Sequence, residues 1–88
     1  MENVDADSLL GLLKLILDFG GRVQIGELAK SLHLTLDELY HVLNTAENLG
    51  AVKMEGNLVA LTRRGLELLR MNFGDLHHLV KLRAEELL

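Results

Sequence analysis

The apolar residues of this chain recur first with the period of a helix and then with the period of a strand. Leucine and isoleucine dominate residues 8–19, and a pair of glycines follows as a stop signal. This pattern predicts a first helix, for which Asp7 or Ser8 is the expected cap. Residues 22–25 then alternate polar and β-branched side chains, which predicts a very short strand.

The next segment predicts two helices separated by a tight turn. A short amphipathic stretch over residues 26–32 precedes a turn at residues 33–34. Thr35 and Glu38 match a capping box, in which each side chain accepts a hydrogen bond from a free amide at the helix start. Gly50 favours a left-handed end to this second helix. The apolar positions near one face of it are Leu36, Leu39, Leu43, Ala46 and Leu49.

The region after this helix predicts a β-hairpin followed by another helix. Two short β-type runs within residues 51–61 flank Gly56-Asn57, a dipeptide that suits a primed two-residue turn. Thr62 can cap the following helix, over residues 63–71. We expect Leu39, Leu43 and Leu49 to be buried between the first helix and this hairpin.

Together these elements predict one domain over the whole chain, because 88 residues suffice for a single small core. The expected fold is mainly α with a small β-hairpin: a winged helix-turn-helix with an extra C-terminal helix that starts at Asn72 or Asp75. Its parts would be a helix-turn-helix over residues 26–50, a wing over 51–61 and C-terminal helices over 63–88.

The charges argue against the DNA reading that this fold often performs. Between Lys30 and Lys53 there is no lysine or arginine, and the second helix of the motif carries Asp37, Glu38 and Glu47. The net charge is −4, whereas DNA affinity comes largely from cations beside phosphates. We therefore expect weak or no binding to nucleic acid. The candidate recognition face, if there is one, comprises Asp37, Tyr40, His41, Asn44, Thr45 and Asn48.

Three cations at the wing are the best candidates for contacts with an anion. Lys53 lies within the predicted hairpin, and Arg63 and Arg64 follow it at the start of the next helix. Arginines at a helix N-terminus oppose the helix dipole, so an anionic partner would explain them, although exposed charges also tolerate this small penalty.

The residue types offer no chemistry for an enzyme. The chain has no cysteine, and the adjacent His77 and His78 would diverge by about 100° on a helix, so they could not readily chelate one ion. The paired carboxylates are sequence neighbours that face different ways, and no nucleophile motif or phosphate loop is present. We expect a non-enzymatic protein without a metal or a cofactor.

The terminal helices instead suggest association with a protein. The first helix is apolar over about three-quarters of its circumference, more than a surface helix of a monomer usually requires. Leucines recur near the C-terminus as well. We expect a homodimer or docking to a protein partner, with a candidate contact face formed by Leu10, Leu17, Leu79 and Leu82.

No segment directs the chain to a membrane. The N-terminus is acidic and lacks the basic-then-apolar order of a signal peptide, and the longest apolar run, over residues 9–17, is too short to span a bilayer. We expect no membrane insertion and a cytoplasmic location.

Several segments resemble a known family, the AAA-associated C-terminal domain, which follows the ATP-binding cassette in some nitrate/sulfonate-type ABC transporter ATPases. The segments that carry the resemblance are Val4-Asp5, Leu9–Leu13, Gly20–Arg22, Glu27–Ala29, Asp37–Leu39, Ala46–Gly50 and Leu61–Gly65. The resemblance implies an accessory module without chemistry of its own and an ABC-type ATPase as a possible partner. The alternative is a small dimeric winged-helix transcriptional regulator that reads DNA with its second motif helix and wing.

Overall fold

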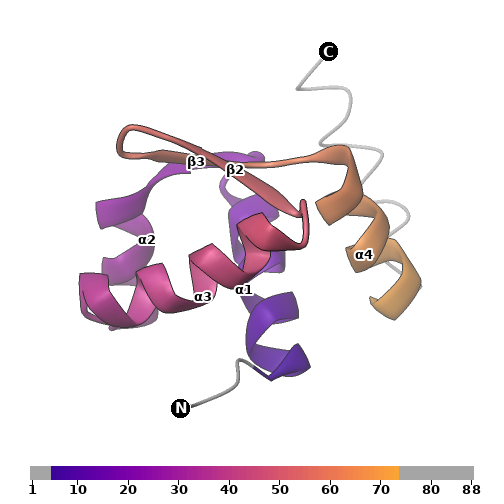
Figure 1. Cartoon of the computed structure of the whole chain (residues 1–88), viewed down its shortest axis with the longest axis horizontal. Helices are drawn as coiled ribbons and strands as arrows, with labels where there is room; N and C mark the ends of the chain where they lie inside the picture. The colour runs from indigo at the N-terminus through magenta and orange to yellow at the C-terminus, as the bar shows by residue number, and fades with distance from the viewer. Residues whose placement is uncertain (1–4, 74–88) are drawn as a thin grey trace.

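A small antiparallel sheet lies over one side of a group of helices in the computed structural model of this chain, which describes residues 5–73 (Figure 1). Four helices and three strands form within these residues. In chain order they are α1 (Ala6–Asp18), β1 (Arg22–Gln24), α2 (Ile25–Leu32), α3 (Leu36–Asn48), β2 (Val52–Glu55), β3 (Leu58–Leu61) and α4 (Arg63–Phe73). The mainly helical winged-helix fold expected from the sequence is confirmed.

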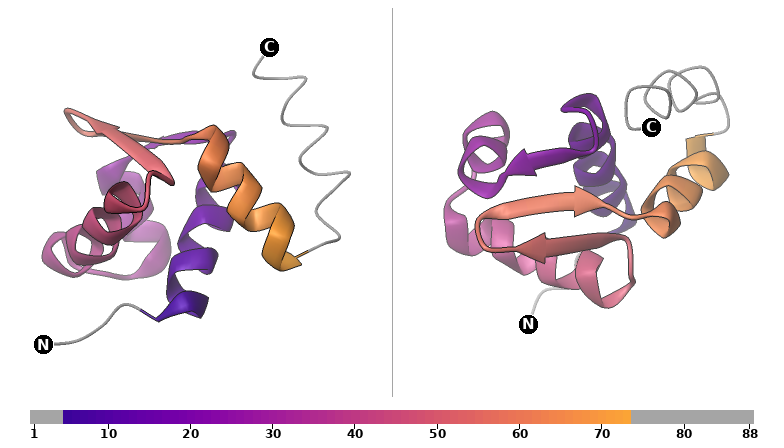
Figure 2. Two further views of the ribbon diagram at one scale, coloured as in Figure 1. Left: turned by 45° about the vertical axis from the view of Figure 1, so that its right-hand side comes forward. Right: turned by 90° about the horizontal axis from the view of Figure 1, so that it is seen from above.

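The strand before the helix-turn-helix joins the hairpin in one sheet. The strand order is β1-β3-β2, and both neighbours run antiparallel to the central strand β3. Val23 pairs with Val59 across the first boundary, and Met54 pairs with the same residue across the second. The right view of Figure 2 looks onto the outer face of this sheet, which none of the described helices covers.

Side-chain hydrogen bonds cap the starts of α1 and α3. The capping box is confirmed: the Glu38 amide donates to Thr35 Oγ1 at 3.1 Å, and the Thr35 amide donates to Glu38 Oε1 at 2.9 Å. The expected cap of the first helix was wrong, since Asp5 takes that role and its Oδ1 accepts from the Ser8 amide at 2.7 Å. An N-cap side chain accepts from an amide in the first turn of its helix. Because α1 already begins at Ala6, the cap is Asp5, and Asp7 and Ser8 lie inside the helix. The bond from the Ser8 backbone, followed by that from its side chain, lowers the pKa of Asp5.

Left-handed residues end the two helices of the motif. His33 closes α2 with φ 57°, and its neighbour Leu34 donates its amide to the Ala29 carbonyl at 3.0 Å. Gly50 follows α3 with φ 78°, as its position after the last apolar residue predicts. Both turns satisfy carbonyls that the helix ends would otherwise leave free.

The core surrounds α1 on two sides. Leu12, Leu13, Ile16 and Leu17 of α1 are all at most 3% exposed. The helix contacts β1, β3 and α3 on one side and α4 on the other, and the left view of Figure 2 shows α4 running alongside it. The wide apolar surface of α1 is therefore largely covered within the chain, and its width does not require a partner.

Two expectations about apolar positions need correction. Leu39 and Leu43 are fully buried as expected, but Leu49 is 46% exposed because it is the C-cap residue of α3 and lies beyond the helical turn that faces the core. Asn72 does not begin a new helix, since it lies inside α4 and its side-chain amide donates to the Leu68 carbonyl. The rest of the expected last helix lies outside the described residues.

Replacing Leu43 with alanine should lower the free energy of unfolding by about 2–5 kcal/mol, because the change removes buried methyl groups and leaves a cavity. The matched control, Leu49→Ala on the same helix, should cost about 1 kcal/mol or less because that side chain is already half in water. Denaturant titrations of the two variants measure the difference. Equal losses in both would contradict the facing of α3 described above.

Candidate functional site

The outward face of α3 gathers the polar residues that the sequence singled out. Asp37, Tyr40, His41, Asn44 and Asn48 are exposed along this helix. The sixth member, Thr45, is half-buried, and its hydroxyl donates to the His41 carbonyl at 3.3 Å, so that hydrogen is already used within the helix. These side chains could form hydrogen bonds with a partner, but α3 contains no lysine or arginine.

The remaining acid of α3 serves the wing instead of this face. Glu47 turns toward the hairpin, where its Oε2 accepts from the Met54 amide of β2 at 3.4 Å. Its carboxylate therefore joins the end of the helix to the outer strand of the sheet. Sequence reasoning counted Glu47 only as a charge that repels DNA.

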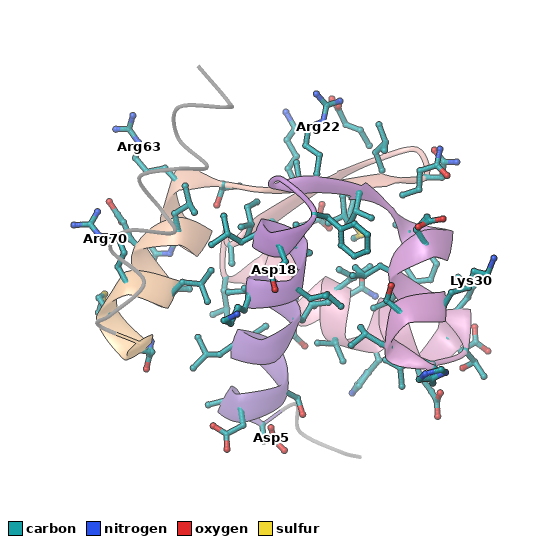
Figure 3. The ribbon with its side chains drawn as sticks, turned by 180° about the vertical axis from the view of Figure 1, so that it is seen from behind. Asp5, Asp18, Arg22, Lys30, Arg63 and Arg70 are labelled. Atoms are coloured by element: carbon teal, nitrogen blue, oxygen red, sulfur yellow. The ribbon has the colours of Figure 1, made fainter. Side chains whose placement is uncertain are left out.

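The three wing cations do not converge on one point. Lys53 projects from β2, whereas Arg63 and Arg64 follow one another at the start of α4. The Arg64 side chain lies against the turn at Gly50. A Cβ atom added to Gly50 would lie 3.1 Å from the Arg64 Cδ. Arg63 projects on the side of the sheet (Figure 3). The cations form separate positive points around the wing and no common pocket.

A tight corner holds the start of α4 against the turn between α3 and β2. The Thr62 hydroxyl donates to the Gly50 carbonyl and accepts from the Gly65 amide at 3.1 Å, and the Thr62 amide donates to the Ala51 carbonyl at 3.0 Å. A Cβ on Gly65 would lie 2.3 Å from the Ala51 oxygen. This corner requires the glycine and fixes where the adjacent arginines emerge.

A hollow lies between α1 and the α2–α3 turn. We call it the α1–α3 groove; it has a volume of about 450 Å³. Its lining is mostly aliphatic and consists of Ser8, Gly11, Leu12, Leu32, Leu34, Glu38, Leu39 and Val42. A volume of this size is typical of binding pockets, and the lining suits apolar side chains better than a polar substrate.

A glycine in the middle of α1 lines this groove. Gly11 is exposed, and a Cβ built on it would meet nothing within 4 Å. Glycine in a helix interior costs about 1 kcal/mol relative to alanine, so local stability alone does not explain the residue. A lone glycine in a leucine-rich helix is visible in the sequence. The groove beside it could not be predicted from the sequence, because it depends on how α1 packs against α3.

Acidic residues lie at the end of the groove formed by the starts of α1 and α3. Glu38 lines it beside the start of α3, and Asp5 and Asp7 belong to the adjoining first turn of α1. The nearest lysine of α1, Lys14, pairs with Asp18 one turn further on at 3.6 Å. Figure 3 shows Asp5 at the opposite end of the molecule from Arg22 and Arg63. Acidic side chains therefore lie on or near the groove, whereas Arg22 and Arg63 lie at the other end of the molecule.

The association face expected from the sequence is altered by the structure. Leu10 is half-buried on α1, but Leu17 is 1% exposed and belongs to the core. Leu17 therefore cannot contact a partner. Leu79 and Leu82 lie outside the described residues.

The described residues contain neither a metal centre nor a membrane-spanning helix. Residues 5–73 contain no group of three histidine, aspartate or glutamate side chains placed to hold a metal ion. Within the same residues, no helix is long and apolar enough to cross a membrane.

Comparison with known proteins identifies one family. The model of the C-terminal AAA-associated domain matches residues 26–88, a range that includes the helix-turn-helix, the wing and α4. The segments before Gly26 that resemble this family in sequence lie outside the matched range. No curated protein and no solved structure matches the chain.

The corner at Thr62 gives a direct test of close packing. Gly65→Ala should destabilise the fold by about 1–3 kcal/mol, because the added methyl group collides with the Ala51 backbone. Gly11→Ala, also inside a helix but with open space at its Cβ, should raise stability by up to about 1 kcal/mol. Thermal melts of the two variants should shift in opposite directions, and a stabilising Gly65→Ala would disprove this packing.

The charge distribution predicts poor DNA binding. We expect no affinity tighter than ~10⁻⁵ M for duplex DNA at physiological salt, because α3 offers acids where a reader needs cations. Fluorescence anisotropy across a salt series measures this. Sub-micromolar binding with a steep salt dependence would contradict the expectation, and Arg63→Ala and Arg64→Ala should then each flatten the log–log slope by about one.

Proposed function

Since this chain belongs to the C-terminal AAA-associated domain family, we propose that it is a non-enzymatic docking module whose α1–α3 groove receives a helix of a protein partner. The observation that carries this proposal is the groove itself: an open aliphatic hollow on a domain whose core is otherwise closed. Gly11 lies on the wall of this hollow with open space at its Cβ position, so a larger side chain placed there can probe the groove without a clash.

The shape and lining of the groove define the kind of partner. Two helices, α1 and α3, form its walls, and the apolar side chains of Leu12, Leu34 and Val42 face the space between them. An amphipathic helix fits such a groove by inserting apolar residues from one face, at spacings of three and four residues. A small polar substrate would leave most of this lining without favourable contacts.

Charge complementarity specifies the flanks of that helix. Glu38 lines the groove, Asp7 lies in the adjacent turn of α1, and no lysine or arginine lines it. A partner helix with lysine or arginine beside its apolar face would be steered to this site and oriented there. Because the chain resembles a domain that follows the ATP-binding cassette in some ABC transporter ATPases, an ABC-type ATPase is the first candidate to carry the segment.

The DNA-binding regulator remains the alternative function. The exposed polar face of α3 and the presence of a wing favour DNA binding. The absence of cations on α3 and the separation of those at the wing argue against it. Self-association is the other way to cover the groove, and the experiment below separates it from docking of a different protein.

The test compares two substitutions at one position. Gly11→Phe should fill the groove from its wall without disturbing the core, because the Cβ position faces open space, and Gly11→Ala is the matched control that leaves the groove open. The probe is a synthetic helical peptide with leucine at docking spacings and lysine elsewhere, and a second peptide replaces each lysine with glutamate. Two-dimensional NMR of the labelled chain reports both the binding site and the affinity.

We expect the lysine peptide to shift the amide signals of Gly11, Leu34 and Val42, and the glutamate peptide to bind more weakly. Gly11→Phe should reduce the affinity at least about tenfold, while Gly11→Ala should not change it. Equal binding to both variants, or shifts confined to other surfaces, would refute the proposal. Light scattering that shows a dimer for the original chain and a monomer for Gly11→Phe would replace it with self-association.

A further inference from the structure

Two cations face each other across the central strand on the outer face of the sheet. Arg22 of β1 and Lys53 of β2 are both paired in register with Ala60 of β3. Directly paired residues of antiparallel strands project to the same face, so the two cationic side chains rise on either side of Ala60. Neighbouring strands are about 4.8 Å apart, which places the two Cα atoms roughly 10 Å from each other. This separation lets two long side chains reach one small group between them.

The space between these cations is a shallow hollow. We call it the sheet hollow; its volume is about 230 Å³, and Arg22, Lys53, Glu55, Leu58 and Ala60 line it. The small side chain of Ala60 keeps its floor low. Figure 3 shows Arg22 directed away from the ribbon on this side of the molecule. No helix of the described chain covers the same face in the right view of Figure 2.

The positive charge of the sheet hollow is only partly neutralised within the described chain. Arg22 forms no ion pair with any residue from 5 to 73. Lys53 Nζ lies 4.0 Å from Glu55 Oε2, but both side chains are more than 70% exposed, so water screens the pair and a stronger anion could displace it. Like charges on nearby strands repel, and a bound anion would relieve that repulsion.

We propose that the sheet hollow binds a compact dianion, the phosphate group of a phosphate monoester. The guanidinium of Arg22 can present two parallel N–H donors to phosphate oxygens, and Lys53 adds a mobile point charge from the other side. Leu58 and Ala60 supply an apolar floor for the carbon atoms of the ester. This site differs in place and in chemistry from the α1–α3 groove.

A single phosphate group fits the charges better than a nucleic-acid strand. Glu55 projects on the same face two residues after Lys53, so a polyanion laid along the sheet would meet a carboxylate. The net charge of −4 also repels a long polyanion, whereas a compact dianion is attracted by the local pair. The monoester can come from a small metabolite or from a phosphorylated side chain of a protein.

The experiment is an NMR titration of the full chain with inorganic phosphate, with chloride at matched ionic strength as the blank. We expect saturable shifts at the amides of Arg22, Lys53 and Ala60 in the millimolar range. Arg22→Gln should weaken binding by about fivefold. The control Arg70→Gln removes an exposed cation of α4 and should have no effect. Ala60→Val should weaken binding as well, because it fills the floor while it keeps both charges and suits a strand.

Further arms identify the source of the phosphate. Tighter binding of a phosphoserine peptide than of ribose 5-phosphate would indicate a protein partner, and the reverse would indicate a metabolite. No saturable shift at tens of millimolar phosphate, equal losses in Arg22→Gln and Arg70→Gln, or tighter binding of a short DNA duplex would each overturn the proposal. Gly11→Phe should leave the titration unchanged, which keeps this result separate from the groove.

Discussion

The fold depends on the burial of α1 between two different neighbours. One side of this helix contacts the sheet and α3, and the other side contacts α4. Its four most buried side chains, Leu12, Leu13, Ile16 and Leu17, together supply a large part of the apolar area that so small a domain can remove from water. Without α4, one side of α1 would remain open to solvent, so the position of α4 determines how much of the helix is left for a partner.

This arrangement also assigns the surfaces of the domain. Because α1 extends beyond the sheet toward its N-terminal end, that end and the α2–α3 turn enclose the groove, with acids at one end of it. The sheet lies on the other side and carries Arg22 and Lys53. The two proposed sites therefore lie on different surfaces of the domain, so occupation of one would not block the other.

Sequence reasoning succeeded where the deciding interactions are local. The capping box of Thr35 and Glu38, the left-handed Gly50 and the hairpin turn at Gly56 each depend on residues within a few positions of one another, so the pattern alone predicts them. It failed where the deciding contact joins distant segments. Whether Leu17 faces a partner or the core depends on how distant elements pack around α1, and the groove beside Gly11 is formed by α1 together with the α2–α3 region. Neither the strand partner of β1 nor the pairing of Arg22 with Lys53 across β3 has a signal in local sequence.

The bond between Glu47 and the Met54 amide has a consequence for how this domain meets other chains. β2 is an outer strand of the sheet, and the unpaired amides of such a strand can template the addition of a foreign strand. The Glu47 carboxylate occupies the Met54 amide and adds a negative charge beside that edge. Addition of a foreign strand along β2 would have to displace this carboxylate, so the end of α3 protects the outer edge of the wing against backbone pairing.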